Sequence, residues 1–368
     1  MLTKHGRLVL DLAPSPENPR NGEGAFLELA DGRIMFVYSS FRASFADDAE
    51  SHLVARYSSD RGETWSEGYV IASPGEYNAM NLMSVSLLRM QNRDVGLFAI
   101  LRMDHHDARL FLFRSSDEGK TWSEPRPIVP GAGYYVTNND RVVRLSTGRI
   151  VVPTALARSR DEAKHGLQAL DVRCTVFVFL SDDDGQTWRE ARSSCAFSNP
   201  HSRSGLQEPG IVELSNGSLW MYFRTDLGRQ YESFSVDGGE SWAPAAPSGF
   251  TSPQSPLSMK REARSRALLA IWNPIPNYET RTIERHSWGR TPLVGALSKD
   301  DGATWTSHFA VEREEDGGGY CYTAIHFTAD SVLLAYYAGR AEDGICNSRL
   351  RITKVPLNAI DQTRGDTR

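Results

Sequence analysis

The sequence predicts an all-β protein, a six-bladed β-propeller whose blades are four-stranded antiparallel sheets with five Asp-box turns. Two repeated patterns predict this fold. One is a short polar motif that ends in tryptophan, and the other is an apolar strand, a polar turn and a second apolar strand. Apolar residues almost never recur with the 3.6-residue period of a helix. Six units of about 60 residues, each with four short strands, describe a propeller.

The polar motif reads Ser-x-Asp-x-Gly-x-Thr/Ser-Trp and occurs five times, at residues 58–65, 115–122, 181–188, 235–242 and 298–305. Ser and Asp side chains form hydrogen bonds with neighbouring backbone groups in a tight loop. The glycine supplies a positive φ, and the tryptophan packs a large apolar surface against the blade. We therefore assign these aspartates an architectural role, on turns between outer strands and far from the propeller axis.

The strand–turn–strand pattern predicts six hairpins, at residues 26–38, 86–100, 142–153, 211–223, 255–272 and 324–337. Asp-Gly, Thr-Gly and Asn-Gly pairs mark three of the turns, as is typical of hairpins. The sixth unit lacks the polar motif, so we expect residues 7–12 to pair beside residues 349–355 and cover an open sheet edge. A single propeller domain over residues 1–360 and a polar tail over residues 361–368 are predicted.

The composition excludes several classes of protein. The chain has 368 residues and a net charge of −5, which disfavours general binding to nucleic acid. No apolar run approaches the ~18 residues of a membrane span, and no signal peptide is visible. We expect a cytoplasmic protein as written, or a secreted or periplasmic one if a leader has been removed. The four cysteines have irregular spacing, which predicts neither a disulfide framework nor a metal site.

Charged and polar residues gather where the predicted inner strands begin and their hairpin partners end. Functional side chains of a propeller meet at these strand ends, around the central channel, because each blade contributes one or two of them. The candidates are Arg20, Glu23, Asp47, Asp48, Asp140, Glu208, Arg224, Arg290, Tyr320 and Tyr322.

Together with the Asp boxes and the hairpins, these residues resemble the exo-α-sialidase (neuraminidase) superfamily over nearly the whole chain. The resemblance implies that three arginines bind the carboxylate of the substrate, and it assigns them to Arg20, Arg224 and Arg290. Arg290 closes a His-Ser-Trp-Gly-Arg segment, which is similar to a segment of the family. A planar, permanently charged guanidinium matches a carboxylate.

The same resemblance assigns the catalytic residues. It implies a tyrosine nucleophile, Tyr322, with Tyr320 as the alternative. Glu208, in a Glu-Pro segment, is implied as the base that activates this tyrosine. An aspartate after the first hairpin is implied as the acid/base; Asp48 is preferred and Asp47 is the alternative. Sialidases are an exception among glycosidases in having a tyrosine nucleophile.

One segment departs from the family. Arg20 stands in Arg-Asn-Gly-Glu-Gly, where the family usually has Arg-Ile-Pro. If Glu23 faces the pocket, its carboxylate weakens the field for an anionic substrate; if it faces away, it is an ion-pair partner of Arg20. We also expect Asp140 to contribute to substrate binding.

The implied activity is that of a retaining exo-glycosidase that hydrolyses terminal sialic acid or a related 2-keto sugar acid. Its partner is a carbohydrate that carries a carboxylate; no metal, organic cofactor, nucleic acid or membrane is expected. Two alternatives remain open. One is a hydrolase or lyase of another carboxylated, uronate-type glycan, and the other is a propeller that binds carbohydrate without turnover.

Overall fold

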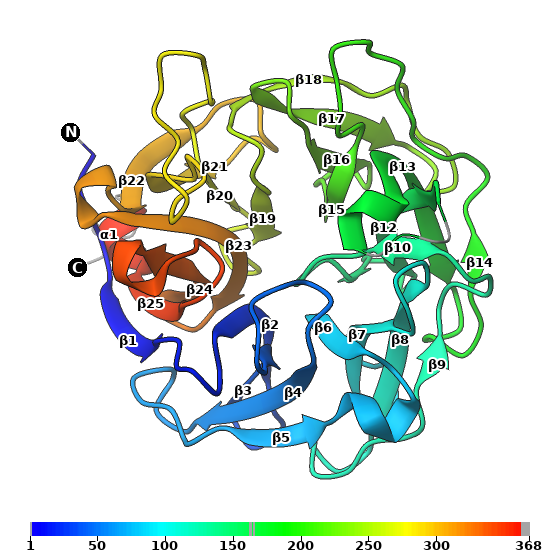
Figure 1. Cartoon of the computed structure of the whole chain (residues 1–368). Helices are drawn as coiled ribbons and strands as arrows, with labels where there is room; N and C mark the ends of the chain where they lie inside the picture. Colours follow the sequence, from blue (N-terminus) through cyan, green and yellow to red (C-terminus); the bar gives the residue numbers. More distant parts are fainter. Residues whose placement is uncertain (1, 162–163, 165, 362–368) are drawn as a thin grey trace.

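The computed structural model describes residues 2–161, 164 and 166–361, which form an all-β fold of five sheets. Figure 1 shows the sheets arranged around a common centre. Among the described residues, no helix has the length and apolar character that a bilayer crossing would need. The residues 362–368 of the predicted polar tail lie outside the described part.

Four sheets have four antiparallel strands each, and within a sheet each strand pairs with the next one named. The first contains β2 (Arg20–Glu28), β3 (Ile34–Phe41), β4 (Ser51–Ser58) and β5 (Tyr69–Ala72). The second contains β15 (Gln207–Glu213), β16 (Leu219–Arg224), β17 (Arg229–Ser235) and β18 (Ala246–Thr251). The third contains β19 (Ser258–Arg261), β20 (Leu268–Trp272), β21 (Leu293–Ser298) and β22 (Thr306–Glu312). The fourth contains β23 (Gly318–Phe327), β24 (Ser331–Arg340), β25 (Leu350–Pro356) and β1 (Arg7–Leu12).

The fifth sheet has nine strands. Its first part contains β6 (Asn81–Arg89), β7 (Val95–Arg102), β8 (Ala108–Ser115) and β9 (Arg126–Pro127). Its second part contains β10 (Tyr134–Val136), β11 (Val143–Arg144), β12 (Ile150–Ser159), β13 (Leu170–Ser181) and β14 (Arg189–Glu190). One parallel residue pair, Tyr134 with Ala108, joins the two parts. Strand pairing therefore gives five sheets, one fewer than the six blades that the sequence predicts.

All six predicted hairpins are confirmed as antiparallel strand pairs. They are β2–β3, β6–β7, β11–β12, β15–β16, β19–β20 and β23–β24. The helices are short: η1 (Pro74–Tyr77), η2 (Gly166–Ala169), η3 (Glu314–Asp316), η4 (Ala341–Asp343) and α1 (Leu357–Ile360). The fold is thus built from the hairpins and the strands that extend them.

The second strand of a hairpin forms the middle of its sheet, and its sequence explains why. β3 is buried along its whole length, and β24 is buried up to its last residue. Continuous apolar runs of this kind fit strands that are packed on both faces. The apolar side chains meet between adjacent sheets, as where Leu53 of β4 joins the same cluster as Leu97 of β7.

The first strands of the hairpins surround the centre. β2, β6, β15, β19 and β23 lie nearest to it in Figure 1, whereas β5, β18 and β22 lie farther out. β2 contacts both β6 and β23, and β15 contacts both β12 and β19. Side chains at the ends of these inner strands therefore share one central space.

The Asp boxes have the architectural contacts that the sequence predicts. In the third box, the Asp183 carboxylate accepts hydrogen bonds from the Thr187 amide at 2.9 Å and from the Thr187 hydroxyl. The Ser181 hydroxyl accepts the amide hydrogen of Gly185, which has φ of 81°. The tight loop at this position requires a residue that tolerates the left-handed region.

The pairing of β1 is confirmed as well. β1 runs antiparallel to β25, with Leu10 opposite Ile352, and so becomes the outermost strand of the sheet that contains β23. Leu10 and Leu12 pack against the buried cluster that contains Ile352 and Phe36. The N-terminal segment thus completes the last sheet in the chain and links it to the first.

Candidate active site

A cavity of about 310 Å³ lies where β2, β6, β15 and β23 meet. Its polar wall contains Arg20, Glu23, Asp47, Arg102, Glu208, Arg224 and Tyr322, together with Ser84, Asn138, Gln207, Gln254 and Asn347. Its apolar wall contains Met83, Ile100, Ala108, Tyr134, Tyr135, Val136, Ala155, Ala157, Leu170, Val172 and Cys174. An outer hollow shares part of the polar wall and adds Asp48 and Arg290.

A larger hollow, of about 700 Å³, lies at the periphery between β1, β25 and α1. It is open to solvent and contains none of the predicted site residues. Because the charged and polar candidates converge on the central cavity instead, we place the site there.

A repeated distortion of the inner strands aims residues into the cavity. Glu23, Ser84, Glu208 and Tyr322 all have positive φ, between 46° and 60°. Each falls at a shift of strand register, where the inner strand bulges away from its hairpin partner. A β-bulge of this kind re-aims a side chain, and left-handed backbone in residues other than glycine marks strain that often serves function. The bulges therefore place one side chain from each of four inner strands at the centre.

Tyr322, Glu208 and Arg224 form a hydrogen-bonded group. The Tyr322 hydroxyl donates to Glu208 Oε1 at 2.6 Å, and Arg224 donates to the same carboxylate at 2.7 Å and to the Tyr322 oxygen at 3.1 Å. Burial, together with the charge of Glu208, raises the pKa of Tyr322 well above its ordinary value. Tyr322 is therefore a neutral phenol in contact with a carboxylate that can accept its proton.

Arg20 contacts two carboxylates. It donates to Glu23 Oε1 at 2.8 Å and to Asp47 Oδ1 at 2.5 Å, and its Nε donates to the Tyr337 hydroxyl at 2.8 Å. Glu23 also accepts a hydrogen bond from the Ser84 hydroxyl. Burial raises the pKa of Glu23, although Arg20 opposes this shift. Glu23 therefore faces the cavity and is at the same time the ion-pair partner of Arg20, which combines the two orientations considered from the sequence.

Arg290 is the third arginine near Tyr322. Its guanidinium donates to the Gln254 carbonyl at 3.1 Å and to Cys321 Sγ at 3.2 Å, and it lies 5.6 Å from the centre of the Tyr322 ring. Among the described residues, no carboxylate lies within 4.0 Å of it. The structure thus brings Arg20, Arg224 and Arg290 together around Tyr322.

The two candidate aspartates differ in their contacts. Asp47 pairs with Arg20 and borders both hollows, whereas Asp48 borders only the outer one, with a carboxylate oxygen 3.8 Å from His105 Nδ1. The setting of Asp47 in the cavity disfavours its charge, but contact with Arg20 outweighs this and lowers its pKa. The Asn81 side chain holds the loop by donating to the Asp47 carbonyl at 2.7 Å. Asp47, rather than the preferred Asp48, therefore contacts the cluster.

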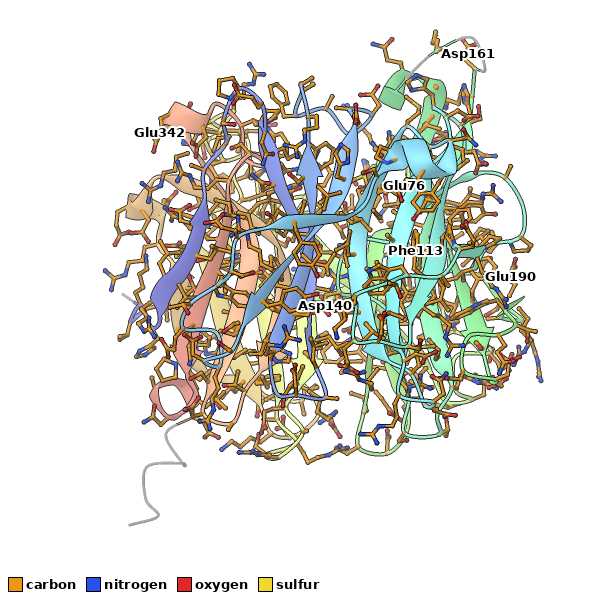
Figure 2. All side chains as sticks on the ribbon, turned by 90° about the horizontal axis from the view of Figure 1, so that it is seen from below. Glu76, Phe113, Asp140, Asp161, Glu190 and Glu342 are labelled. Carbon is orange, nitrogen blue, oxygen red and sulfur yellow. The ribbon has the colours of Figure 1, made fainter. Side chains whose placement is uncertain are left out.

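Two other candidates lie elsewhere. The Asp140 carboxylate accepts hydrogen bonds from Lys260 Nζ at 2.9 Å and from the Ile325 amide at 3.0 Å, and Asp140 is absent from the described cavity lining. In Figure 2 it lies in the lower half of the molecule, far from Asp161 and Glu342 at the upper end. Tyr320 packs with Tyr336 inside an apolar cluster. The Asp140 carboxylate thus links β19 and β23 in this structure, and its role in substrate binding stays a prediction.

Several polar residues of the cavity are not among the candidates named from the sequence: Ser84, Arg102, Asn138, Gln207, Gln254 and Asn347. Arg102 is the charged one. It is the last residue of β7, is 5% exposed and borders both hollows. The sequence pattern could have indicated Arg102, because Arg224, which was a candidate, occupies the same position at the end of the second strand of its hairpin. A regular spacing also marks the bulge positions. Each of three bulge residues stands nine residues before a hairpin-turn residue of positive φ: Glu23 before Gly32, Ser84 before Arg93 and Glu208 before Gly217.

Comparison with known proteins gives the family. Residues 87–334 match the model of the BNR repeat-like domain, and residues 56–67 match the BNR/Asp-box repeat. A sialidase from Bacteroides fragilis is 24% identical over 230 residues, which cover 59% of this chain and 37% of that protein. The chain spans about half or less of the length of the curated relatives that it matches.

Solved structures share the fold over nearly the whole chain. A protein of unknown function from Dyadobacter fermentans superposes with a TM-score of 0.69 at 19% identity, covering 95% of this chain and 99% of that one. The Hadza microbial sialidase Hz136 superposes with a TM-score of 0.71 at 16% identity, covering 96% of this chain and 69% of that one. With its Asp boxes and its matching domain model, the chain belongs to the BNR repeat-like family of the exo-sialidase superfamily.

Proposed function

We propose that this protein is a retaining exo-glycosidase that releases a terminal sialic acid or a related 2-keto sugar acid. The observation that carries the proposal is the 2.6 Å hydrogen bond from the Tyr322 hydroxyl to Glu208, with Arg224 and Arg290 beside the same phenol. A tyrosine, a base and a group of cations in one buried space fit this chemistry better than any other. The sialidase names of the curated relatives support it.

The arginines would bind the carboxylate of the sugar acid. Arg290 has no carboxylate partner within 4.0 Å among the described residues, and Arg224 donates a hydrogen bond to the Tyr322 oxygen at 3.1 Å. A hydrogen bond to a charged group contributes about 1.5–3 kcal/mol, so a bidentate contact to either guanidinium favours an acidic sugar strongly. Arg20, which Glu23 and Asp47 already neutralise, contributes less to this attraction.

Tyr322 would attack the anomeric carbon while Glu208 takes the proton of its hydroxyl. A carboxylate nucleophile would be repelled by the carboxylate that a 2-keto sugar acid carries on the same carbon, and a neutral phenol is not. Asp47 would give a proton to the leaving oxygen. Burial opposes its ionisation, but Arg20 outweighs this and lowers its pKa, so the protonated form is the minor one and this step favours acidic pH. Asp47 would then take a proton from the water that cleaves the tyrosyl–sugar bond, while Tyr322 recovers its proton from Glu208. Two displacements give net retention.

The size of the cavity fits action at chain ends. Its volume of about 310 Å³ stands at the lower end of ligand pockets. One sugar residue with its substituents would fill it. This supports removal of a terminal residue rather than cleavage within a long polysaccharide.

The fold is proposed to be a six-bladed propeller. The two parts of the nine-stranded sheet share only the residue pair Tyr134–Ala108, and each contains its own hairpin and its own Asp box. Counted as separate blades, they bring the total to six.

The variant Tyr322→Phe tests the proposed mechanism. It removes the hydroxyl that attacks the sugar but leaves the ring, so turnover of a fluorogenic α-sialoside should fall by at least about 10³-fold. The melting temperature should change little, because the phenol is lost at the cavity surface. Tyr320→Phe is the matched control and should keep its activity. An unchanged rate for Tyr322→Phe would reject the mechanism.

A second candidate function follows from Glu23. Its carboxylate in the cavity neutralises Arg20 and suits a substrate other than sialic acid. The protein would then hydrolyse or eliminate another carboxylated, uronate-type glycan. A screen of carboxylated glycosides separates the candidates, since an elimination product absorbs in the near ultraviolet. Glycan binding without any product would instead indicate a carbohydrate-binding propeller.

A further inference from the structure

The charges in the central cavity are unevenly matched. Four guanidinium groups border the two hollows: Arg20, Arg102, Arg224 and Arg290. Arg20 contacts Glu23 and Asp47, and Arg224 contacts Glu208. Among the described residues, Arg102 and Arg290 have no carboxylate within 4.0 Å. Two cations, Arg102 at the end of β7 and Arg290 in the loop before β21, are thus left for a ligand.

The protein gives Arg102 unusually weak hydrogen-bond partners. Its Nε is buried and has no acceptor, and its Nη2 faces only the thioether sulfur of Met83 at 3.9 Å. The guanidinium carbon lies 5.1 Å from the centre of the Tyr134 ring. A buried charge without a paired and hydrogen-bonded partner is costly, so its retention at a cavity wall indicates a ligand group that completes it.

The neighbours of Arg102 define the second part of the cavity. Ile100, two residues earlier on β7, faces the same side, and Met83, Tyr134, Ala155 and Ala157 complete an apolar wall around it. An apolar wall lowers the local dielectric and so strengthens the attraction of the guanidinium for an anion. A guanidinium can donate two parallel hydrogen bonds, which match the paired oxygens of a carboxylate or a sulfate ester.

We propose that Arg102 binds a second anionic group of the substrate, so that the preferred substrate is a sugar acid with two negative charges. One is the carboxylate bound near Arg290 and Arg224, and the other is a carboxylate or sulfate held by Arg102 beside the apolar wall. This inference rests on the proposed function, because it names the substrate class of the same site. Arg102 is then a specificity-determining residue.

The competing role of Arg102 is to act through Asp47. The charge of Arg102 contributes to the lowered pKa of Asp47, after that of Arg20. A positioning role of this kind would change the pH profile of turnover but would not distinguish singly from doubly charged ligands. The two roles are therefore separable by experiment.

The test compares ligand binding in the full chain that carries Tyr322→Phe, so that no probe is consumed. Calorimetric titrations use glucuronate and N-acetylneuraminate as singly charged probes, and 2-O-sulfated glucuronate and glucarate as doubly charged ones. The two doubly charged probes distinguish a sulfate from a carboxylate. Arg102→Met removes the charge, and Arg102→Lys keeps the charge but not the planar fork. Arg126→Met, on the exposed strand β9, is the matched control.

We expect at least one doubly charged probe to bind at least about tenfold more tightly than the singly charged ones, and Arg102→Met to abolish this preference. Arg102→Lys should retain part of it, and the control should retain all of it. Equal affinity of both kinds of probe, or equal weakening of both in Arg102→Met, would overturn the proposal. If Arg102→Met proves unfolded by its melting curve, Arg102→Lys alone decides. If the protein does not hydrolyse sialosides but still prefers doubly charged probes in a way that depends on Arg102, only the proposed activity is overturned.

Discussion

A carboxylate that forms an ion pair with an arginine reduces the attraction of that arginine for an anionic substrate. Glu23 occupies the bulge of β2 and contacts Arg20, whereas the equivalent bulge of β6 carries the neutral Ser84. Two of the three arginines that the family resemblance names are therefore paired with acids before any ligand arrives. At the scale of single residues, selectivity depends on these pairings as much as on the arginines themselves.

The variant Glu23→Gln isolates this effect. Gln keeps the size of the side chain and its hydrogen bond with Ser84 but removes the negative charge that Glu23 places beside Arg20. Binding of N-acetylneuraminate should tighten by about three- to tenfold, since a charge-assisted contact to Arg20 becomes available. Calorimetric titration measures it, and Asp140→Asn, outside the cavity, is the control. Unchanged or weaker binding by Glu23→Gln would show that Arg20 does not face the ligand.

The sequence predicts most of the polar cluster because strand ends are visible in it. Arg20, Glu208 and Arg224 stand at such ends, Tyr322 lies within β23, and Arg290 lies in the loop before β21. The structure brings all five together around one cavity. The sequence does not separate Asp47 from Asp48, because the direction of each side chain in this loop depends on contacts with distant residues. Asn81 donates to the Asp47 carbonyl, and Arg20 donates to the Asp47 carboxylate. Arg102 was missed because an arginine at the end of an apolar strand is also typical of a surface charge.

At the scale of elements, the Asp boxes should make stability depend on pH. Burial opposes ionisation of Asp183, but the hydrogen bonds from Thr187 and Ser181 outweigh it and lower the pKa to about 2. The unfolded value is near 3.9. A lowered folded pKa adds stability that is present above about pH 4 and is lost as the pH falls through about 2.

The variant Asp183→Asn tests this contribution. Asn keeps the shape but loses the charge, so unfolding should cost about 0.5–1 kcal/mol less at pH 6, a fall of a few degrees in melting temperature. The difference from the parent protein should narrow as the pH falls from 4 toward 2. Calorimetry across this range measures it, and Glu190→Gln on exposed β14 serves as control. A difference that stays constant with pH would contradict the role of the charge.

At the scale of the whole molecule, β1 protects the edge of β25. Leu10 and Leu12 pack on the cluster that contains Ile352, while Leu8 is 47% exposed. An uncovered strand edge is a template for pairing with another chain. Removal of residues 1–12 should therefore lower the melting temperature and promote self-association.

Calorimetry and size-exclusion chromatography at several concentrations would measure both effects. Leu8→Asp, which changes an exposed position of the same strand, should leave both unchanged. A truncated protein that stays monomeric and melts at the parent temperature would show that β1 adds nothing to the closure of the sheet.

The hairpins and the Asp boxes, and with them the β-rich architecture, follow from local sequence patterns. The union of two predicted blades into one nine-stranded sheet does not follow from these patterns. It depends on a single residue pair, Tyr134 with Ala108, that joins the two parts of this sheet. Local patterns specify strands and turns, whereas contacts of this kind depend on how the assembled sheets meet.

The left-handed bulges have a consequence for how such a site changes through evolution. The same backbone kink in four inner strands presents an acid, a serine, a base and a phenol to one space. A single codon change at one kink would exchange a reactive group without moving the main chain. New chemistry is thus accessible to this scaffold by substitution alone, with the framework of strands left intact.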